Sequence, residues 1–353
     1  MGNESIEASF LSVFALISFF IFLITSKYSH KFKSGILLDA DFVKPQAFHE
    51  QPITRSGGIA IMFSLFIFFG IYYLLFSKIL YDYILLSSLI FLIGFLDDLK
   101  IKITPAKRLI VMILILFSFS YIFQLKILHV DIIFIKFITE NHFLSTIFVL
   151  LCFLFVVNGA NLIDGFNGML TIHIIIINSI LAYINLENSN LEFSFILISQ
   201  IIILLSFLLF NFPTAKIFLG DGGAYLLGSL IALNVIITNN LYPNISSFFF
   251  CTLLFYLFFE VFFSFFRKLY NGKSPFYPDD SHLHMLSFYK ISKVLGKEKS
   301  NFLNSIIINI GFLILILPGI YFLENPYLSR YWFFMLLLIY MIIYFRLYRL
   351  TKN

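Results

Sequence analysis

Long apolar runs separated by short polar stretches make up most of the chain. A bilayer core about 30 Å thick takes about 20 apolar residues in a helix, and lipid offers backbone polar groups no partners outside that helix. We therefore predict an all-α polytopic membrane protein with about eleven transmembrane helices. Their approximate ranges are 8–25, 57–76, 79–96, 109–125, 143–157, 169–184, 194–210, 217–236, 245–266, 303–323 and 331–349.

Two other segments bear on this organisation. The stretch ILHVDIIFIKFI (127–138) alternates like a strand, carries two charges and is too short to span, so we expect an external interfacial piece. The start, MGNESIEASF, has acids where a cleaved signal peptide has positive charges, which predicts that the first run is a retained span. We expect a single integral-membrane domain over residues 1–353.

Composition excludes a soluble fold. The chain is 60% hydrophobic and 12% charged, against about 45–50% and about 25% in soluble domains. The two cysteines, Cys152 and Cys251, both fall inside apolar runs. They predict neither a disulfide framework nor a metal site.

Basic residues orient the spans. With the N-terminus outside and the C-terminus cytoplasmic, 20 of the 24 Lys and Arg residues fall on the cytoplasmic side. The cytoplasmic loops are then about 26–56, 97–108, 158–168, 211–216 and 267–302. The basic residues are spread over several loops without base-stacking aromatics, so we expect a lipid bilayer and no nucleic acid as a partner.

Five unusually polar stretches all fall on that predicted cytoplasmic face. They are KPQAFHEQPITRSGG (44–58), GFLDDLKIKITPAKR (94–108), NGANLIDGFNG (158–168), NFPTAKIFLGDGGAYLLG (211–228) and GKSPFYPDDSHLHML (272–286). Ten of the 19 acids lie on the same side. We expect the five stretches to converge on one site at the membrane surface.

The aspartates of these stretches have two interpretations. Asp97 and Asp98 could be a solvated helix end, or they could hold Mg²⁺ or accept a proton. Asp221 precedes two glycines near the start of a span. It marks either a flexible turn or a carboxylate placed where a phosphate can approach the backbone and a helix N-terminus.

The histidines and one buried acid are also ambiguous. His282 and His284 are either plain surface residues or groups that contact phosphate and shuttle protons. His173, inside a span, we interpret as a core residue. Glu260 is an intramembrane acid and so a functional candidate, or it simply faces the bundle interior. Cationic side chains beside aspartates suit a metal-bound diphosphate, although an anion transporter would use them too.

Taken together, HEQPITRSGGIAI, GFLDDL, NGANLIDGFNGM, NFPTAKIFLGDGGAYLLG and GKSPFYPDDSHLH resemble the polyprenyl-phosphate N-acetylhexosamine-1-phosphate transferases of glycosyltransferase family 4. The resemblance covers about residues 39–290. It implies transfer of a sugar-1-phosphate from a UDP-N-acetylhexosamine donor to undecaprenyl phosphate, with Mg²⁺ or alternatively Mn²⁺, and release of UMP. It also implies a bacterial inner (cytoplasmic) membrane enzyme with a cytoplasmic site, and it leaves a homodimer open.

The resemblance implies roles for particular residues. The catalytic candidates are Asp97, Asp98, Asp164 and His282, and the metal ligands are Asp221, Asp98 and Asn161. The substrate-binding candidates are His49, Arg55, Asn158, Asn161, Asn167, Asn211, Lys216, Phe218, Lys273 and His284, of which Asn211 and Phe218 match positions of a uridine pocket.

Departures from the family pattern favour one branch. Met285 follows His284 where other members have a further histidine, Asn167 replaces a common aspartate, and Asp280 stands where a basic residue is frequent. The missing triple histidine and the eleven spans favour the branch that initiates O-antigen and teichoic-type polymers, with N-acetylglucosamine as the first expectation for the sugar. The alternatives are the phospho-N-acetylmuramoyl-pentapeptide transferase of peptidoglycan synthesis and a transporter of an anionic solute.

Overall fold

The computed structural model describes residues 3–29, 31, 35–39, 52–101, 103–275 and 279–352. These residues form thirteen helices and one two-stranded sheet, which confirms the all-α prediction. The elements are α1 (Asn3–Tyr28), β1 (Leu38–Asp39), β2 (Ile53–Thr54), α2 (Gly57–Phe76), α3 (Tyr81–Asp98), α4 (Pro105–Ile122), α5 (Ile133–Glu140), α6 (His142–Ile163), α7 (Met169–Glu187), α8 (Leu191–Asn211), α9 (Gly220–Leu241), α10 (Ser247–Tyr270), α11 (Leu283–Leu295), α12 (Lys297–Tyr321) and α13 (Pro326–Lys352).

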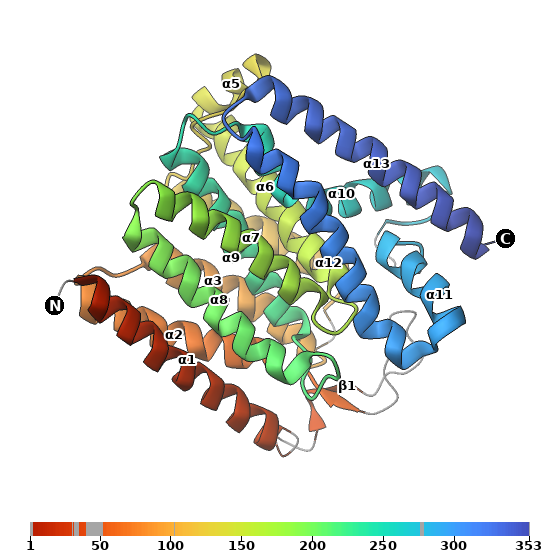
Figure 1. Cartoon of the computed structure of the whole chain (residues 1–353), viewed down its shortest axis with the longest axis horizontal. Coiled ribbons are helices and arrows are strands. Elements are labelled where there is room, and N and C mark those ends of the chain that lie inside the picture. Colours follow the sequence, from red (N-terminus) through yellow and green to blue (C-terminus); the bar gives the residue numbers. More distant parts are fainter. Residues whose placement is uncertain are drawn as a thin grey trace.

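Every predicted span coincides with a long helix. Among the described residues, ten helices are long and apolar enough to cross a membrane. The eleventh predicted span is α3, which has 18 residues and carries three aspartates, Asp82, Asp97 and Asp98, at its ends. The N- and C-terminal ends lie at opposite ends of the bundle (Figure 1), as an odd number of crossings requires.

The segment 127–138 contains a helix where the alternation suggested a strand. Its second half begins the short helix α5, which lies at the end of the bundle away from β1 (Figure 1). Ile133, Phe134 and Phe137 are all strongly exposed. They share one helical face, because positions i, i+1 and i+4 are neighbours on a helix. The apolar face suits a membrane interface, which stays a prediction.

The helix α9 forms the centre of the bundle. It packs against α2, α3, α6 and α7, and glycines let two of these neighbours approach its backbone. A Cβ atom on Gly228 would lie 2.8 Å from the Cα atom of Val157 in α6, and one on Gly223 would lie 2.9 Å from that of Gly58 in α2. Small residues at such crossings allow the van der Waals packing that holds helices together in lipid.

A buried polar cluster links α9 to α3, α7 and α8. The Tyr83 hydroxyl of α3 donates to the Asn234 side chain of α9 over 2.7 Å. The Asn234 amide in turn donates to Gln200 of α8 at 2.8 Å and to Asn178 of α7 at 3.1 Å. Because these groups have no water to bond to, their mutual hydrogen bonds fix the register of the four helices.

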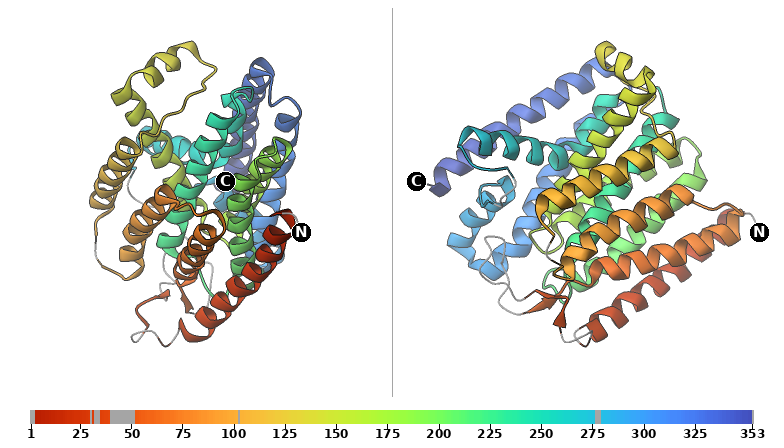
Figure 2. Two further views of the ribbon diagram at one scale, coloured as in Figure 1. Left: turned by 90° about the vertical axis from the view of Figure 1, so that its left-hand side faces the viewer. Right: turned by 180° about the vertical axis from the view of Figure 1, so that it is seen from behind.

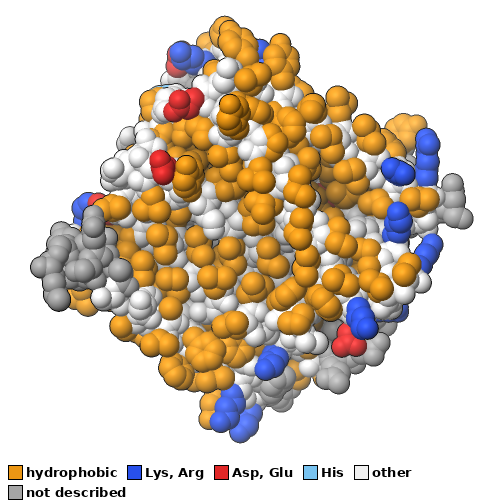
Figure 3. All heavy atoms as spheres, in the orientation of Figure 1, with side chains coloured by type: hydrophobic (Ala, Val, Ile, Leu, Met, Phe, Trp, Pro, Cys, Tyr) orange, Lys and Arg blue, Asp and Glu red, His pale blue; other side chains and the backbone are white. Residues whose placement is uncertain are grey.

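The outer surface matches a bilayer. Apolar side chains cover the middle of the face shown in Figure 3, while Lys and Arg side chains gather along its lower and right-hand edges. Figure 2 gives the side and rear views, in which α1 and α2 lie along one side of the bundle and α13 along the other. The strongly basic end of the molecule is therefore the end that carries β1 and α11.

Replacing Asn234 with alanine should destabilise the bundle. The change leaves the partners Tyr83, Asn178 and Gln200 short of hydrogen bonds, and we expect a loss on the order of 1–2 kcal/mol. Unfolding in mixed detergent micelles measures it. The exposed Asn244, which bonds Glu324 at the surface, supplies the control Asn244→Ala, and equal effects of the two variants would contradict the role of the buried cluster.

Candidate active site

A helix cap brings three of the predicted aspartates together. The carboxylate of Asp98, the last residue of α3, accepts hydrogen bonds from the backbone amides of Asp221 at 3.0 Å and Gly222 at 2.9 Å. These amides belong to the first turn of α9, where N–H groups lack helical partners and the helix dipole favours an anion. A Cβ atom on Gly94 would lie only 2.4 Å from the Asp221 carbonyl oxygen. The close α3–α9 crossing thus places Asp97 and Asp98 beside Asp221.

Two arginines hold these carboxylates. Arg108, in the first turn of α4, donates through Nη1 to Asp97 at 2.8 Å and to Asp221 at 3.1 Å. Arg55, just after β2, donates to Asp98 at 3.4 Å and contacts Asp221 at 4.0 Å. The side chains of Asp97 and Asp221 keep 33% and 24% of their surface exposed, against 2% for Asp98. Asp97 and Asp221 are therefore the carboxylates open to a ligand.

Asp164 interacts with the charges of this group. It directly follows α6 and is half-buried, and burial together with the charge of Asp221 raises its pKa to about 8. The charge of Asp98 also raises the pKa of Asp164, and the charge of Arg55 lowers it. We call Asp97, Asp98, Asp164 and Asp221 the aspartate cluster. Even with Asp164 protonated at neutral pH, Asp97, Asp98 and Asp221 lie beside only two arginines, one of which also binds Asp39. The negative charge is therefore in excess, and a cation would neutralise it.

The aspartate cluster alone supplies only some of the ligands that a magnesium ion needs. Among the described residues, no three His, Cys, Asp or Glu side chains form a group that could hold a metal ion. Mg²⁺, however, needs only one or two carboxylates when substrate phosphates supply further ligands. Asp97 and Asp221 both contact Arg108 and both remain partly exposed, so they suit that arrangement. Both oxygens of Asp98 already accept amide hydrogen bonds.

The first and fourth polar stretches are joined by backbone hydrogen bonds. Thr54 of β2 accepts from the amide of Phe218 at 2.8 Å, and the Phe218 carbonyl accepts from Gly57 at 2.8 Å. This pairing fixes Arg55 beside the start of α9, and Arg55 also binds Asp39 of β1 at 2.7 Å. His49, predicted from the same stretch, lies outside the described residues.

Three predicted asparagines bond to the protein itself. The buried Asn211 accepts from the Gly168 amide at 2.6 Å and donates to the Ile217 carbonyl at 2.9 Å. Asn167 donates to the Pro213 carbonyl at 2.8 Å, so both residues tie the α6–α7 turn to the segment before α9. Asn158 donates to Leu154, one turn back along α6. Their predicted contacts with substrate stay predictions.

Four other predicted binding residues remain open to solvent. Lys216 and Lys273 are exposed, and Asn161 and Phe218 are half-buried. Lys216 and Phe218 lie in the segment just before α9, and Asn161 lies in the last turn of α6. Lys216, Phe218 and Asn161 thus border the elements that carry the aspartate cluster, whereas Lys273 follows α10.

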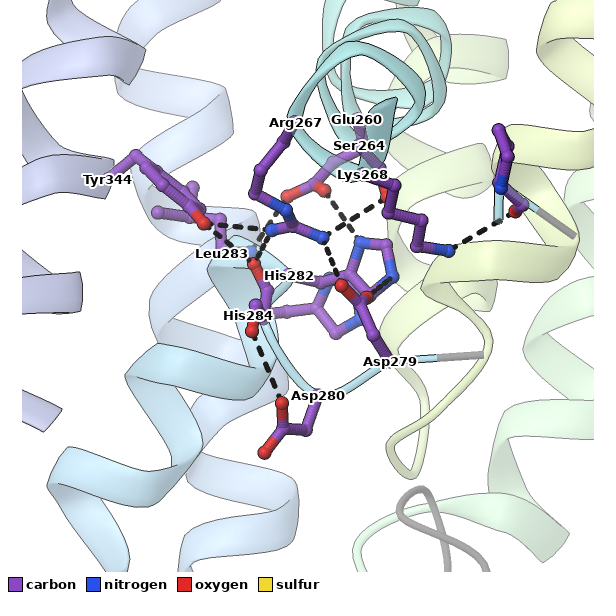
Figure 4. Close-up of polar contacts among 12 residues, drawn as sticks. Glu260, Ser264, Arg267, Lys268, Asp279, Asp280, His282, Leu283, His284 and Tyr344 are labelled. Carbon is purple, nitrogen blue, oxygen red and sulfur yellow. Dashed lines mark hydrogen bonds and ion pairs between the residues drawn. The ribbon is translucent and has the colours of Figure 1, made fainter. Parts of the chain in front are cut away.

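The two histidines of the fifth stretch are buried, and His282 is enclosed by carboxylates (Figure 4). Its Nδ1 atom lies 3.1 Å from Glu260 and its Nε2 atom 3.0 Å from Asp279. Burial alone would lower the pKa of His282, but the hydrogen bonds to Asp279 and Glu260 raise it above its ordinary value. A carboxylate oxygen lies beside each ring nitrogen, an arrangement that favours the protonated ring, which donates from both nitrogens. The catalytic role predicted for His282 stays a prediction.

Further bonds extend this group across three helices. Glu260 of α10 also accepts from the Leu283 amide of α11 at 3.0 Å and from the Tyr340 hydroxyl of α13 at 2.8 Å. Arg267 of α10 donates to Asp279 at 2.7 Å. We call Glu260, Arg267, Asp279, His282 and Tyr340 the histidine network. Of the two interpretations of Glu260, the structure supports the one in which it faces the bundle interior.

The remaining histidines are packed among aromatic groups. The ring of His284 stacks on that of His282 with 5.5 Å between centroids, and its Nδ1 atom lies 3.3 Å from the Tyr256 hydroxyl. Burial lowers the pKa of His284 to about 3, so this ring is neutral. His173 is fully buried and its Nδ1 atom lies 3.1 Å from Asn309, which confirms the core interpretation.

Arg108 is the site residue that the sequence did not single out. It was counted only among the charges that orient the spans. One signal was present, because a cation in the first turn of a helix opposes the helix dipole. Arg108 tolerates that position because Asp97 and Asp221 neutralise it.

Replacing Asp164 with asparagine should stabilise the ligand-free protein more as the pH rises. The carboxyl group of an aspartate in the unfolded chain titrates near pH 3.9. Between about pH 4 and pH 8 Asp164 therefore holds a proton only in the folded state, and the free energy of unfolding decreases as the pH rises. An asparagine amide does not titrate, so the variant does not lose stability in this way. Apparent Tm values with EDTA at pH 5, 6.5 and 8 test it, and a constant difference between Asp164→Asn and the parent protein would contradict the raised pKa.

Comparison with known proteins shows which family the chain resembles. Residues 79–239, from α3 to α9, match the family model described as glycosyl transferase family 4. The chain is 28% identical over 284 residues to the undecaprenyl-phosphate alpha-N-acetylglucosaminyl 1-phosphate transferase of Thermotoga maritima, covering 79% of this chain and 81% of that protein.

Two further relatives show the breadth of the similarity. The probable undecaprenyl-phosphate N-acetylglucosaminyl 1-phosphate transferase of Bacillus subtilis is 26% identical, over 67% of this chain and 66% of its own. A phospho-N-acetylmuramoyl-pentapeptide-transferase of Streptococcus agalactiae is 32% identical, over only 40% of this chain and 44% of its own. The region that matches the family model contains the whole aspartate cluster, so the chain is similar to glycosyl transferase family 4 in the part that carries the site.

Proposed function

We propose that the protein transfers N-acetylhexosamine-1-phosphate, with N-acetylglucosamine as the first candidate sugar, from a UDP-sugar to undecaprenyl phosphate. The reaction releases UMP and starts the synthesis of a cell-surface polysaccharide of the O-antigen or teichoic type. The observation that carries this proposal is the aspartate cluster held by Arg55 and Arg108 at one end of a membrane-spanning bundle. A water-soluble nucleotide diphosphate and a lipid phosphate can meet there.

The chemistry is one displacement at phosphorus. An oxygen of the lipid phosphate attacks the phosphorus atom that bears the sugar, a new P–O bond forms, and the bridging P–O bond breaks with its electrons leaving on UMP. Phosphoryl transfer depends mainly on positioning and electrostatics. Asp97, with a third of its side chain exposed, is placed to orient the lipid phosphate and accept its proton. Arg55 and Arg108 supply fixed positive charge.

A divalent cation completes the charge balance. We expect Mg²⁺, or Mn²⁺ in its place, at Asp221 beside Asp97, the two partly exposed carboxylates that share Arg108. When bound, the cation neutralises the diphosphate and stabilises the leaving UMP. Asp98 then acts by capping α9, which holds Asp221 in position. Asn161 stays a predicted further ligand.

The exposed groups around the cluster suit the donor. The half-buried ring of Phe218 offers a face on which a uracil ring can stack, and the exposed Lys216 lies two residues before it. Lys273, also exposed, follows α10 and suits a phosphate or the sugar. These assignments rest on position and chemistry.

Orientation follows from charge. The end of the bundle that carries β1 and α11 is also the edge where Lys and Arg gather (Figure 3), and positive residues favour the cytoplasmic side. We therefore place the site on the cytoplasmic face of a bacterial inner membrane, with the N-terminus outside.

The second candidate is a phospho-N-acetylmuramoyl-pentapeptide transferase. It is favoured by relatives of that name, such as the one of Streptococcus agalactiae. Against it, the longer matches are to N-acetylglucosaminyl 1-phosphate transferases. Met285 stands where a third histidine is expected, and its thioether cannot donate a hydrogen bond or a proton as a histidine would.

Purified protein with undecaprenyl phosphate, Mg²⁺ and a panel of UDP-sugars should release UMP. We expect release with one UDP-N-acetylhexosamine, only when the lipid is present, and little with UDP-MurNAc-pentapeptide. Turnover with the pentapeptide donor alone would establish the second candidate. Absence of UMP from every donor, with protein shown to be folded, would overturn the proposal.

Replacing Asp221 with asparagine should reduce kcat/KM about 100-fold or more, as loss of a group that stabilises transition-state charge does. Asp82→Asn is the matched control, because Asp82 lies at the other end of α3 and bonds the Tyr83 amide there. UMP release over a Mg²⁺ titration measures both variants. Near-normal turnover by Asp221→Asn would refute the assignment of the metal ligand.

A further inference from the structure

A deep apolar cleft opens between α12 and α13, away from the aspartate cluster. Its volume is about 680 Å³, within the range of about 300–1,000 Å³ typical of ligand pockets. Side chains of α10 form its back wall, for example Phe255 and Tyr256, and α11 closes one end. Figure 1 shows α12 and α13 splayed apart here, and Figure 3 shows the surface hollowed between them.

One glycine leaves this cleft open. A Cβ atom built on Gly311, in the middle of α12, would meet no atom within 4 Å, and Gly311 lines the cleft. Without a ligand, the lining of a cleft of this size has few van der Waals partners on its open side. An apolar cavity does not hold water well, whereas a hydrocarbon chain would restore the contacts.

The mouth of the cleft is basic. Lys290 of α11 is exposed and is the single charged residue among the described residues that line the cleft. Lys293 lies one helical turn further on, and Arg346 and Arg349 of α13 flank the lining residue Leu347. All three are exposed. A ligand with an apolar chain and an anionic head complements both parts.

We propose that the cleft binds an acyl chain of an anionic phospholipid whose headgroup phosphate pairs with Lys290. Anionic lipids are attracted to basic segments at the cytoplasmic surface, and the cleft opens directly to the bilayer between two spans. The site is separate from the acceptor site, because a reacting lipid phosphate must reach the aspartate cluster at α3 and α9. Lys290 belongs to α11, on the side of the bundle away from α1 and α2 (Figure 1).

The bound lipid would act on the histidine network. Leu283 and Tyr340 line the cleft, and the same two residues donate hydrogen bonds to Glu260. A chain packed against them holds α11 and α13 at the distance that these bonds need. Phospholipid binding thus stabilises the segment that carries Asp279 and His282.

The test compares lipids of equal chain length in protein stripped of lipid in a neutral detergent. Phosphatidylglycerol in about 100-fold excess over its Kd should raise the apparent Tm by several degrees, and phosphatidylcholine should raise it less. Gly311→Leu fills the cleft and should abolish the shift. Lys290→Gln should make the Tm shifts with the two lipids equal. This second variant tests the proposal even if Gly311→Leu lowers stability by itself.

The control is Gly70→Leu. Gly70 lies in α2, and a Cβ atom there would also meet no atom within 4 Å, so this variant adds the same side chain to a helix outside the cleft and should keep the full shift. Equal shifts in Gly311→Leu and the parent protein would overturn the site. The proposal would also be overturned if Gly311→Leu raised the KM for undecaprenyl phosphate and left the Tm shift with phosphatidylglycerol unchanged. The cleft would then bind the acceptor lipid.

Discussion

The cap that Asp98 forms on the first turn of α9 is the interaction on which the site depends. It joins the end of one helix to the start of another that is 122 residues further along the chain, Asp98 to Gly220, and the backbone contact at Gly94 leaves no freedom in their crossing. Unpaired amides at a helix N-terminus stabilise a carboxylate placed on them. The same crossing sets the positions of Asp97 and Asp221, which stay partly exposed.

Two ionic groups at the same end of the bundle serve different purposes. In the aspartate cluster, the carboxylates carry more negative charge than Arg55 and Arg108 neutralise, so the site favours a bound cation. In the histidine network, each carboxylate has a basic partner, because His282 lies between Glu260 and Asp279 and Arg267 also binds Asp279. Unpaired buried charges are costly. The first group is therefore suited to ligand binding and the second to holding α10, α11 and α13 in register.

Much of the site could be predicted from the chain. The spans followed from apolar length, and the closeness of Asp97, Asp98, Asp164 and Asp221 followed from placing their loops on one face. The partners of these residues could not be predicted. Arg108 was hidden among residues that orient the spans, and Asn211 looked like a substrate ligand although it bonds the backbone of Gly168 and Ile217. Nothing in the sequence HLH shows that the first histidine is buried between two carboxylates.

The sequence by itself determined the number of long helices, the face on which polar loops gather and the residue types available for phosphate chemistry, because these depend on local hydrophobicity and order along the chain. Only the tertiary structure decided which carboxylates are exposed, which are consumed by helix caps and ion pairs, and that α12 and α13 leave a cleft between them. Those features depend on how close helices distant in sequence approach each other, and that distance is set by glycines such as Gly94 and Gly228 together with their neighbours across the interface.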